Sequence, residues 1–302
     1  MAENDERPTV SILDPDDRST TAAIDALIAA AESDHDHPAL DEPSRLAWRG
    51  RAGFVGLVVG SPGSATAYGQ LTQRDRSFTL EVVAGSSVGA EAARAAILES
   101  ALAIARDRGG SELRFWVNRF DGTDDPHLRA LGFEAERDLV QMRVPLPIEG
   151  TRPSAGPFTL RSFRPGADEE AWLRVNNRAF ASHPEQGRWD LATVRAREQT
   201  DWFDPDGFLM CEEDGRLAGS CWTKVHRDKD PVLGEIYVIS VDPDFQRRGL
   251  GKLLAYAGLD WLAKRAPVGM LYVDGTNTAA IELYRSLGFT ADHTDRCYLN
   301  RF

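Results

Sequence analysis

The chain has 302 residues, of which 42% are hydrophobic, and this is enough for two domains of ordinary size with proper cores. Its net charge is -12 and its pI is about 5.0, which argues against a nucleic acid partner, because a phosphate backbone requires a broad basic face. No stretch approaches the roughly 18 apolar residues of a membrane-spanning helix, so we expect no membrane partner.

The beginning of the chain predicts its compartment. Residues Met1 to Arg7 are acidic and polar, unlike a secretory signal, so we expect a cytoplasmic protein. The cysteines are odd in number and form no C-x-x-C pair, which does not suggest a disulfide framework. The histidines are scattered, with only His35 and His37 close together, and we expect no metal.

The first half contains a hydrophobic strand ending at Val83, a loop over residues 85–89 and a helix from Ala90 to Ala105. The loop contains glycines, whose backbone amides could face a phosphate, but it carries no charge. A second strand ends at Val117, and Leu131-Gly132-Phe133 follows it.

A segment rich in Pro and Gly, from Pro145 to Pro157, separates the two halves. Such a composition is typical of a linker. We therefore predict an N-terminal domain over residues 1–148, a linker over 149–157 and a C-terminal domain over 158–302.

Asp214-Gly215 predicts a hairpin turn between two strands that carry Cys211 and Cys221. With a two-residue loop, Cys211 should face Ala218, so the two thiols should not be opposed. Small core or sheet residues are favoured for both cysteines over a nucleophile or a metal ligand.

The most informative segment begins with a strand from Glu235 to Val241, which Asp242-Pro243 ends. An Arg- and Gly-rich loop then leads into an amphipathic helix over residues 252–263. Glycines allow a tight turn and the helix N-terminus adds partial positive charge, so this order predicts a phosphate cradle. It is neither a dinucleotide fingerprint nor a Walker loop. The predicted cradle residues are Gln246, Arg247, Arg248, Gly249, Leu250, Gly251 and Lys252. The alternative for the two arginines is a solvated surface pair.

A strand from Met270 to Val273, a turn over residues 274–276 and a helix follow. Asn277 is the expected N-cap, and Gly288 suits the left-handed position after the helix, with Phe289 folding back on the last turn. Leu287-Gly288-Phe289 repeats the Leu-Gly-Phe of the first half at the same distance from a strand end. Two related domains are the natural inference.

The pattern Asn277-x-x-Ala280-x-x-x-Tyr284-x-x-x-Gly288-Phe289, after the Arg-Gly loop, resembles the GNAT acyltransferase superfamily. The resemblance implies two tandem α/β domains, each a twisted mixed β-sheet flanked by helices. It also implies acetyl-CoA as cosubstrate, in a cleft where two neighbouring strands splay apart. Besides the cradle, the residues that it assigns to acetyl-CoA are Ile239, Ser240, Val241, Asn277, Thr278, Ala279, Ala280, Ile281 and Glu282, and in the first half Val82, Val83 and Ala84.

Further motifs in the second half resemble the mycothiol synthase family; they are residues 183–187, Trp202-Phe203-Asp204-Pro205, Trp222-Thr223-Lys224-Val225 and residues 234–238. That family acetylates the cysteinyl amine of a glucosamine-inositol thiol. The resemblance implies a small-molecule thiol-sugar substrate bound by Glu42, Glu185, Lys224, Glu235 and Tyr272, and we expect a monomer. Lys224 could instead be an ordinary surface lysine, and Asp41 could serve in place of Glu42.

Glu235 is the candidate base that removes a proton from the amine, directly or through a water, and Tyr284 the candidate acid for the departing thiolate. Backbone N–H groups near residues 239–241 would polarise the acetyl carbonyl in a direct transfer. The plainer alternatives are an exposed strand carboxylate and a core aromatic. In the first half Ser77 replaces Glu235 and Leu128 replaces Tyr284, which predicts a structural or substrate-clamping domain with weak or no acetyl-CoA binding.

Two other functions stay open. One is a GNAT enzyme acting on a different amine, such as a protein N-terminus or an antibiotic. The other is an acetyl-CoA sensor without catalysis, which the presence of both Glu235 and Tyr284 disfavours.

Overall fold

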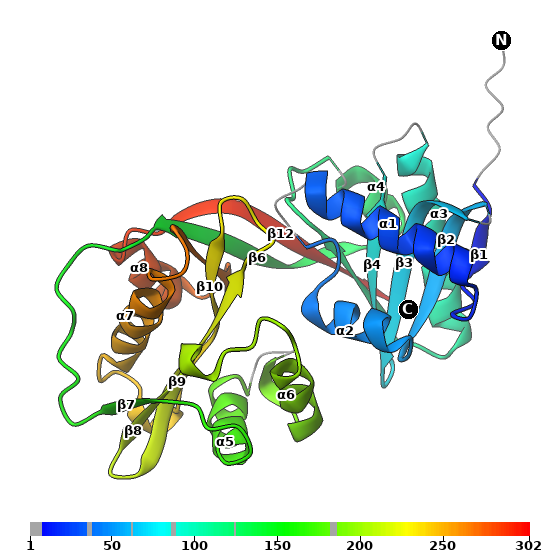
Figure 1. The fold of residues 1–302 in the computed structure, drawn as a ribbon. Helices are drawn as coiled ribbons and strands as arrows, with labels where there is room; N and C mark the ends of the chain where they lie inside the picture. Colours follow the sequence, from blue (N-terminus) through cyan, green and yellow to red (C-terminus); the bar gives the residue numbers. More distant parts are fainter. Residues whose placement is uncertain (1–7, 35–37, 62, 86–88, 124, 182–185) are drawn as a thin grey trace. The chain divides into compact units, whose positions relative to one another are not determined.

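The structure is a computed structural model, which describes residues 8–34, 38–61, 63–85, 89–123, 125–181 and 186–302 (Figure 1). The chain forms two compact units. Unit 1 holds residues 1–138 and 295–302, and unit 2 holds residues 139–294. In the described part of the chain, no helix has both the length and the apolar character needed to cross a bilayer.

Unit 1 is a mixed sheet with strand order β1-β2-β3-β4-β5-β12, in which β4 and β5 are parallel. Its elements are β1 (Val10–Ile12), α1 (Arg18–Asp34), α2 (Glu42–Gly50), β2 (Phe54–Ser61), β3 (Ser64–Arg74), β4 (Ser77–Ala84), α3 (Ala90–Asp107), β5 (Glu112–Val117), α4 (Asp125–Ala130), β6 (Glu134–Pro145), which continues into unit 2, and β12 (Thr290–Arg301), which begins in unit 2.

Helices cover both faces of the unit 1 sheet (Figure 1). On one face α3 buries Ile97 and Ala101 against strand residues such as Leu71 and Leu80. On the other face α1 and α2 bury Ile24 and Trp48, together with Tyr68 of β3. Alternate side chains of each strand therefore enter two separate cores, as the pleat requires.

Unit 2 repeats this plan with strand order β6-β11-β10-β9-β8-β7, in which β10 and β11 are parallel. Its further elements are β7 (Thr159–Ser162), α5 (Glu169–Ala179), η1 (Gln186–Arg188), α6 (Leu191–Glu198), η2 (Pro205–Gly207), β8 (Phe208–Glu213), β9 (Arg216–His226), β10 (Leu233–Val241), η3 (Pro243–Phe245), α7 (Leu250–Leu262), β11 (Val268–Asp274) and α8 (Thr278–Ser286).

The two faces of the unit 2 sheet also have separate cores. The apolar stripe of α7 packs with α8 against Cys221 of β9 and Ile236 of β10. Across the sheet, Trp222 and Val238 pack with Trp172 of α5 and Val194 of α6. Gly258 permits the close approach of α7, because a Cβ there would lie 2.5 Å from the Cys221 sulfur.

The two units share local geometry. The parallel pairing ends at Leu80 and Phe115 in unit 1 and at Ile236 and Leu271 in unit 2. Gly132 and Gly288 both have positive φ, 83° and 93°, after equivalent helices. The predicted repeat and the predicted mixed α/β sheets are therefore confirmed.

The shared pairing corrects one predicted equivalence. Counting back from Leu80 and Ile236, the position of Glu235 corresponds to Thr79 and not to Ser77. The two strands end differently, because β10 carries a bulge after Ile236, so counting from strand ends was misleading. Leu128 does correspond to Tyr284, as predicted.

The predicted turn at Asp214-Gly215 is confirmed, since Glu213 pairs with Arg216 across it. The predicted partner of Cys211 is wrong. A register shift between Cys211 and Glu212 places Cys211 opposite Gly219 instead of Ala218. The two thiols are nevertheless not opposed, because Cys221 pairs with Leu209.

The compact units do not divide at residues 149–157, because each of the strands β6 and β12 is divided between the two units. Residues 139–145 of β6 pair with β11 in unit 2. Residues 296–301 of β12, from the end of the chain, pair with β5 in unit 1. Each unit is therefore completed by a strand segment from the other half of the sequence.

Candidate active site

Glu235 lies on β10 with only 7% of its surface exposed. It is opposite Lys224 on β9 and Met270 on β11, so the side chains of all three project from one face of the sheet. Its Oε2 atom lies 2.7 Å from Nε2 of His226. A buried carboxylate in contact with a single imidazole is a chemically plausible proton acceptor.

The Lys224 ammonium lies among aromatic rings. Its Nζ is 4.6 Å from the centre of the Trp202 ring and 5.5 Å from that of Tyr237. Tyr237 sits at the bulge of β10, which places it with the aromatic residues beside α5 and α6. Lys224 is therefore a partly buried cation on the Glu235 face and not an ordinary surface lysine.

The backbone of β10 changes partners next to Glu235. Pairing with β11 covers Leu233–Ile236, whereas β10 continues to Val241. In the described residues, Ile239, Ser240 and Val241 pair with β9 on one edge but have no register with β11 on the other. The resemblance to the GNAT superfamily implied that two neighbouring strands separate, without saying where, and β10 and β11 lose their pairing here.

The loop that follows turns sharply into α7. Arg247 and Gly249 have φ values of 60° and 80°, and Gly249 is the N-cap of α7 without a side-chain hydrogen bond. The N–H groups of the first helical turn, at residues 250–252, have no acceptor within the helix. A pyrophosphate would fit these donors and the positive end of the helix dipole.

The two arginines of the loop differ. Arg247 is exposed at a left-handed position. Arg248 forms a double hydrogen bond with Glu213, at 2.7 and 2.5 Å, and its guanidinium lies 4.8 Å from the centre of the Phe158 ring. Part of the Arg248 charge is thus neutralised by Glu213.

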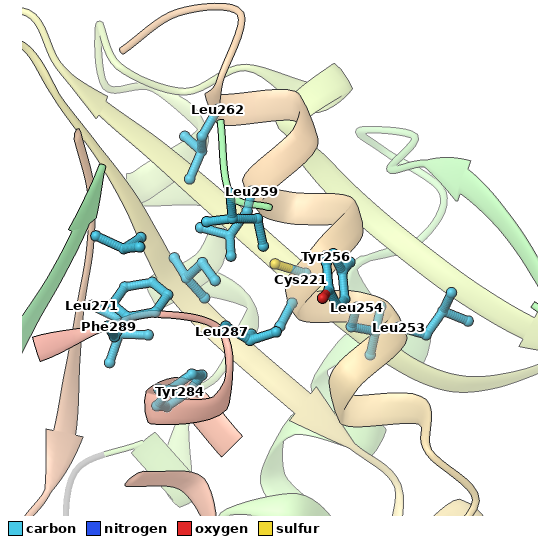
Figure 2. Close-up of a cluster of buried hydrophobic side chains, with 14 of the residues drawn as sticks. Cys221, Leu253, Leu254, Tyr256, Leu259, Leu262, Leu271, Tyr284, Leu287 and Phe289 are labelled. Atoms are coloured by element: carbon cyan, nitrogen blue, oxygen red, sulfur yellow. The ribbon is translucent and has the colours of Figure 1, made fainter. Parts of the chain in front are cut away.

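Tyr284 lies on the other face of the sheet. It is 5% exposed in the core formed by α7 and α8, with its ring centre 5.8 Å from that of Phe289 (Figure 2). Burial, assisted by the nearby Cys221, raises the pKa of the Tyr284 hydroxyl above its ordinary value. A phenol is protonated at neutral pH even at its ordinary pKa, and the raised pKa makes Tyr284 a weaker acid than a free tyrosine. The structure brings Lys224 and Glu235 together on one face and leaves Tyr284 on the other.

The start of α8 is as expected, because the Asn277 side chain accepts a hydrogen bond from the Ala280 N–H. Thr278, Ala279 and Glu282 are exposed near this end of the helix, and Ala280 and Ile281 are half-buried. These positions are open to a ligand, but their predicted role stays a prediction.

The remaining predicted residues lie in several places. Tyr272 of β11 accepts a hydrogen bond from Gln141, at 2.8 Å. Glu42 is the first residue of α2, directly after its N-cap Asp41. Glu185 lies outside the described residues. Val82, Val83 and Ala84 end β4, beyond the last parallel pair with β5.

His226 is the residue that sequence reasoning missed. It follows Trp222-Thr223-Lys224-Val225 in the sequence, two positions after Lys224 on the same strand. The period of two along a strand could have placed it on the same face as Lys224. Only the register of β9 against β10 shows that it reaches Glu235.

Neither cysteine of the hairpin is suited to nucleophilic attack. Burial raises the pKa of the Cys211 thiol and of the Cys221 thiol to about 12. Across the described ranges, no three His, Cys, Asp or Glu side chains are grouped as metal ligands.

Several known proteins resemble this chain in sequence or in fold. The profile of the acetyltransferase (GNAT) family matches residues 171–289, a range that includes Lys224 and Glu235 as well as the loop before α7. A tandem GNAT protein from the clavulanic acid biosynthesis pathway has a similar fold, with a TM-score of 0.71 at 16% identity. The superposition covers 97% of this chain and 98% of that one. At this identity the likeness concerns the fold alone.

Sequence relatives are closer. A mycothiol acetyltransferase of Acidimicrobium ferrooxidans is 51% identical over 206 residues, which is 66% of this chain and 66% of that protein. The match thus spans just under two thirds of that relative. A mycothiol acetyltransferase of Streptomyces griseus is 37% identical over 298 residues, which is 96% of this chain and 94% of that protein.

Proposed function

The chain belongs to the mycothiol acetyltransferase family of GNAT proteins, and we propose that it transfers the acetyl group of acetyl-CoA to the cysteinyl amine of desacetylmycothiol. The product is mycothiol. The observation that carries the proposal is the buried polar group of Glu235, His226 and Lys224 beside the point where β10 leaves β11. The near full-length identity to a mycothiol acetyltransferase supports the substrate.

The amine must lose a proton before it can attack. A free α-amine has a pKa of about 8, so much of it is protonated at neutral pH. Glu235 accepts this proton, directly or through one water, and the freed lone pair attacks the thioester carbonyl. The backbone N–H groups of residues 239–241 polarise the carbonyl oxygen.

The leaving group completes the reaction. The nitrogen–carbon bond forms as the carbon–sulfur bond breaks, and the CoA thiolate takes a proton from Tyr284. That phenol carries its proton at neutral pH. The transfer takes place in one ternary complex, and the raised pKa values of Cys211 and Cys221 speak against an acyl-enzyme.

Acetyl-CoA binds through the start of α7. The N–H groups of residues 250–252 and the exposed Arg247 hold its pyrophosphate, and Asn277 with the first turn of α8 lies along the rest of the cofactor. Lys224 and Tyr272 of unit 2 bind the hydroxyl-rich sugar and inositol, and the roles expected for Glu42 and Glu185 stay predictions. Fixed donors and acceptors suit such a ligand, because analogues that lack a hydroxyl leave them unpaired.

In the described part of unit 1, apolar or uncharged side chains stand at the positions of the two candidate catalytic groups, Glu235 and Tyr284. Thr79 occupies the position of Glu235, and the buried Leu128 that of Tyr284. We therefore assign turnover to unit 2 alone and a structural or substrate-clamping role to unit 1.

One assay tests the function. The purified protein, acetyl-CoA and desacetylmycothiol are mixed, and mass spectrometry follows the acetylated thiol. We expect product formation that depends on the protein. If no product forms while a peptide or antibiotic amine is acetylated, the chain is a GNAT enzyme with another acceptor. If no amine is acetylated although acetyl-CoA binds, the sensor alternative holds.

A further inference from the structure

The contact between Glu235 and His226 is buried and specific. The Oε2 to Nε2 distance is 2.7 Å, and the two side chains are only 9% and 13% exposed. An ionised carboxylate can only accept hydrogen bonds, so the imidazole nitrogen that faces it must carry the hydrogen. This contact therefore assigns Nε2 of His226 as the hydrogen-bond donor to Glu235.

Strand register explains why these two residues meet. His226 lies opposite Leu233, two positions from Glu235, and is therefore the diagonal neighbour of Glu235 on the same face. Lys224, directly opposite Glu235, has its ammonium over the rings of Trp202 and Tyr237. Lys224 is thus in contact with the two aromatic rings, whereas Glu235 is in contact with His226.

We propose that His226 is the positioning residue of the catalytic base, holding Oε2 of Glu235 so that Oε1 receives the proton of the substrate ammonium. This inference rests on the proposed function. When the N–H bond of the ammonium breaks, its hydrogen forms a bond with Oε1 and the lone pair stays on the amine. His226 keeps its own proton throughout.

The orientation of the Glu235 carboxylate matters because Lys224 is an alternative partner for it. Without His226, the nearest cation across the strands is Lys224, and the carboxylate would turn towards it. A carboxylate paired with a lysine is a weaker base, and the lysine would no longer be held for the substrate. Loss of the imidazole N–H should therefore affect the chemical step more than acetyl-CoA binding.

Two substitutions at the same position separate the hydrogen bond from the volume of the ring. His226→Gln keeps an N–H donor and should retain kcat within about threefold. His226→Phe keeps a ring of similar size without a donor and should lower kcat by roughly 10- to 100-fold, as expected for the loss of a hydrogen bond to a charged group. The KM for acetyl-CoA should stay within about twofold in both variants, because neither substitution changes a residue that we assign to acetyl-CoA binding.

Arg161→Gln is the control for a general loss of stability in unit 2. Arg161 pairs with the buried Asp168, at 2.6 Å, and with Glu212, away from Glu235. This variant should lower the Tm and leave kcat unchanged. The proposal is overturned if His226→Phe turns over at the wild-type rate, or if Gln and Phe reduce kcat equally.

An NMR measurement tests the contact independently of turnover. Long-range 15N spectra of the full-length protein, with His226→Gln used for assignment, should show a hydrogen on Nε2 of His226. A bare Nε2 would overturn the proposal. A wild-type protein that does not acetylate desacetylmycothiol but shows the hydrogen on Nε2 would instead refute the proposed function alone.

Discussion

Glu235 owes its character to its neighbours and not to its position on a strand alone. It is buried, opposite Lys224 and hydrogen-bonded to His226. A strand carboxylate without these contacts would be an ordinary solvated acid, which was the plainer interpretation of the sequence. The three side chains together make a site where one carboxylate oxygen is held and the other is presented.

Replacing this carboxylate gives the most direct prediction. Glu235→Gln keeps the volume and the contact to His226 but cannot accept a proton from the amine. We expect kcat to fall by roughly 10² or more, the typical contribution of a general base, with little change in the KM for acetyl-CoA. Steady-state kinetics with desacetylmycothiol would measure both constants. The exposed Glu170, on α5, provides the control Glu170→Gln, and equal kcat values in the two variants would remove Glu235 from its role.

Glu81 in unit 1 shows a different use of a buried carboxyl group. Its Oε1 atom accepts the Asp41 N–H at 2.8 Å, at the start of α2, while Oε2 is buried without a hydrogen-bond partner. Burial, reinforced by the Asp41 carboxylate, raises the pKa of Glu81 well above its ordinary value. The folded state therefore holds a proton at pH values where the unfolded chain has already released it.

This proton makes stability depend on pH. A raised folded-state pKa means that stability falls as pH rises from the unfolded pKa of about 4.3 towards the folded value. Glu81→Gln has no proton to lose, so it should unfold about 2–4 °C higher at pH 8, which corresponds to roughly 1 kcal/mol in a domain of this size. The gain should vanish near pH 4. Thermal unfolding at both pH values would measure it.

Glu112 is a control of opposite sign in the same unit. Burial raises the pKa of Glu112, but the hydrogen bonds from Arg114 and Ser77 more than offset this and lower it overall. Glu112→Gln should therefore reduce stability at pH 8. If both variants shifted the Tm in the same direction, the buried proton on Glu81 would not be the cause.

Single residues differ in how far the sequence could predict them. The N-cap role of Asn277 and the turn at Asp214-Gly215 follow from local backbone chemistry, and both are confirmed. The contact of His226 depends on cross-strand register, and the proton on Glu81 depends on burial. Neither property is local in the sequence, so neither could be predicted from it.

At the scale of one element, α7 contains two glycines whose surroundings differ: one is closely packed and the other is not. Gly258 lies against β9, and a Cβ on it would come within 2.5 Å of the Cys221 sulfur. Gly251, in the first turn, has no such neighbour, because the nearest atom to its Cβ would be a methyl carbon of Leu283 at 3.8 Å. Packing within the chain therefore explains Gly258 but not Gly251.

A ligand that approaches the backbone closely would explain Gly251. Glycine in a helix costs about 0.5–1 kcal/mol relative to alanine, so Gly251→Ala should raise the Tm by about 2–3 °C. The added methyl group would crowd the pyrophosphate, and the Kd for acetyl-CoA should rise by about tenfold or more. Thermal unfolding and calorimetric titration would measure the two effects.

Gly258→Ala is the matched control in the same helix. Its methyl group collides with β9, so this variant should lose stability, whereas the start of α7 is not changed directly. Tighter or equal acetyl-CoA binding by Gly251→Ala would show that the cradle does not hold the pyrophosphate.

The element scale also shows where sequence patterns were sufficient. The strand, loop and helix of residues 235–262 and the Leu-Gly-Phe turns were predicted from periodicity and glycine chemistry, and the structure confirms them. The bulges were not predicted. They shift the register beside Cys211 and after Ile236, and they account for the wrong partner of Cys211 and the wrong counterpart of Glu235.

At the scale of the whole molecule, the linker does not mark the boundary of the compact units. The Pro/Gly-rich composition predicted a division at residues 149–157. In the structure, the last eight residues, 295–302, belong to unit 1, because β12 pairs with β5. A strand carries no local mark of its partner, so composition alone could not reveal this exchange.

Removing the last eight residues should therefore destabilise unit 1. Deleting residues 295–302 removes the partner of β5 and the fully buried Tyr298, and frees the Arg119 N–H from Asp295. Loss of one such aromatic side chain typically costs roughly 3–5 kcal/mol. We expect faster hydrogen exchange in β4 and β5 of unit 1, with β9, β10 and α7 still protected. Mass spectrometry of peptic fragments would locate the change.

Phe289→Ala provides the reciprocal control. Phe289 is 2% exposed in the core of unit 2, and its counterpart Phe133 is 1% exposed in unit 1. Phe289→Ala should speed exchange in β10 and α7, and Phe133→Ala should act like the deletion. If the deletion instead exposed α7 and β11 while β5 stayed protected, the C-terminal strand would belong with the half of the sequence that precedes it. The exchange of strands described for the two units would then be wrong.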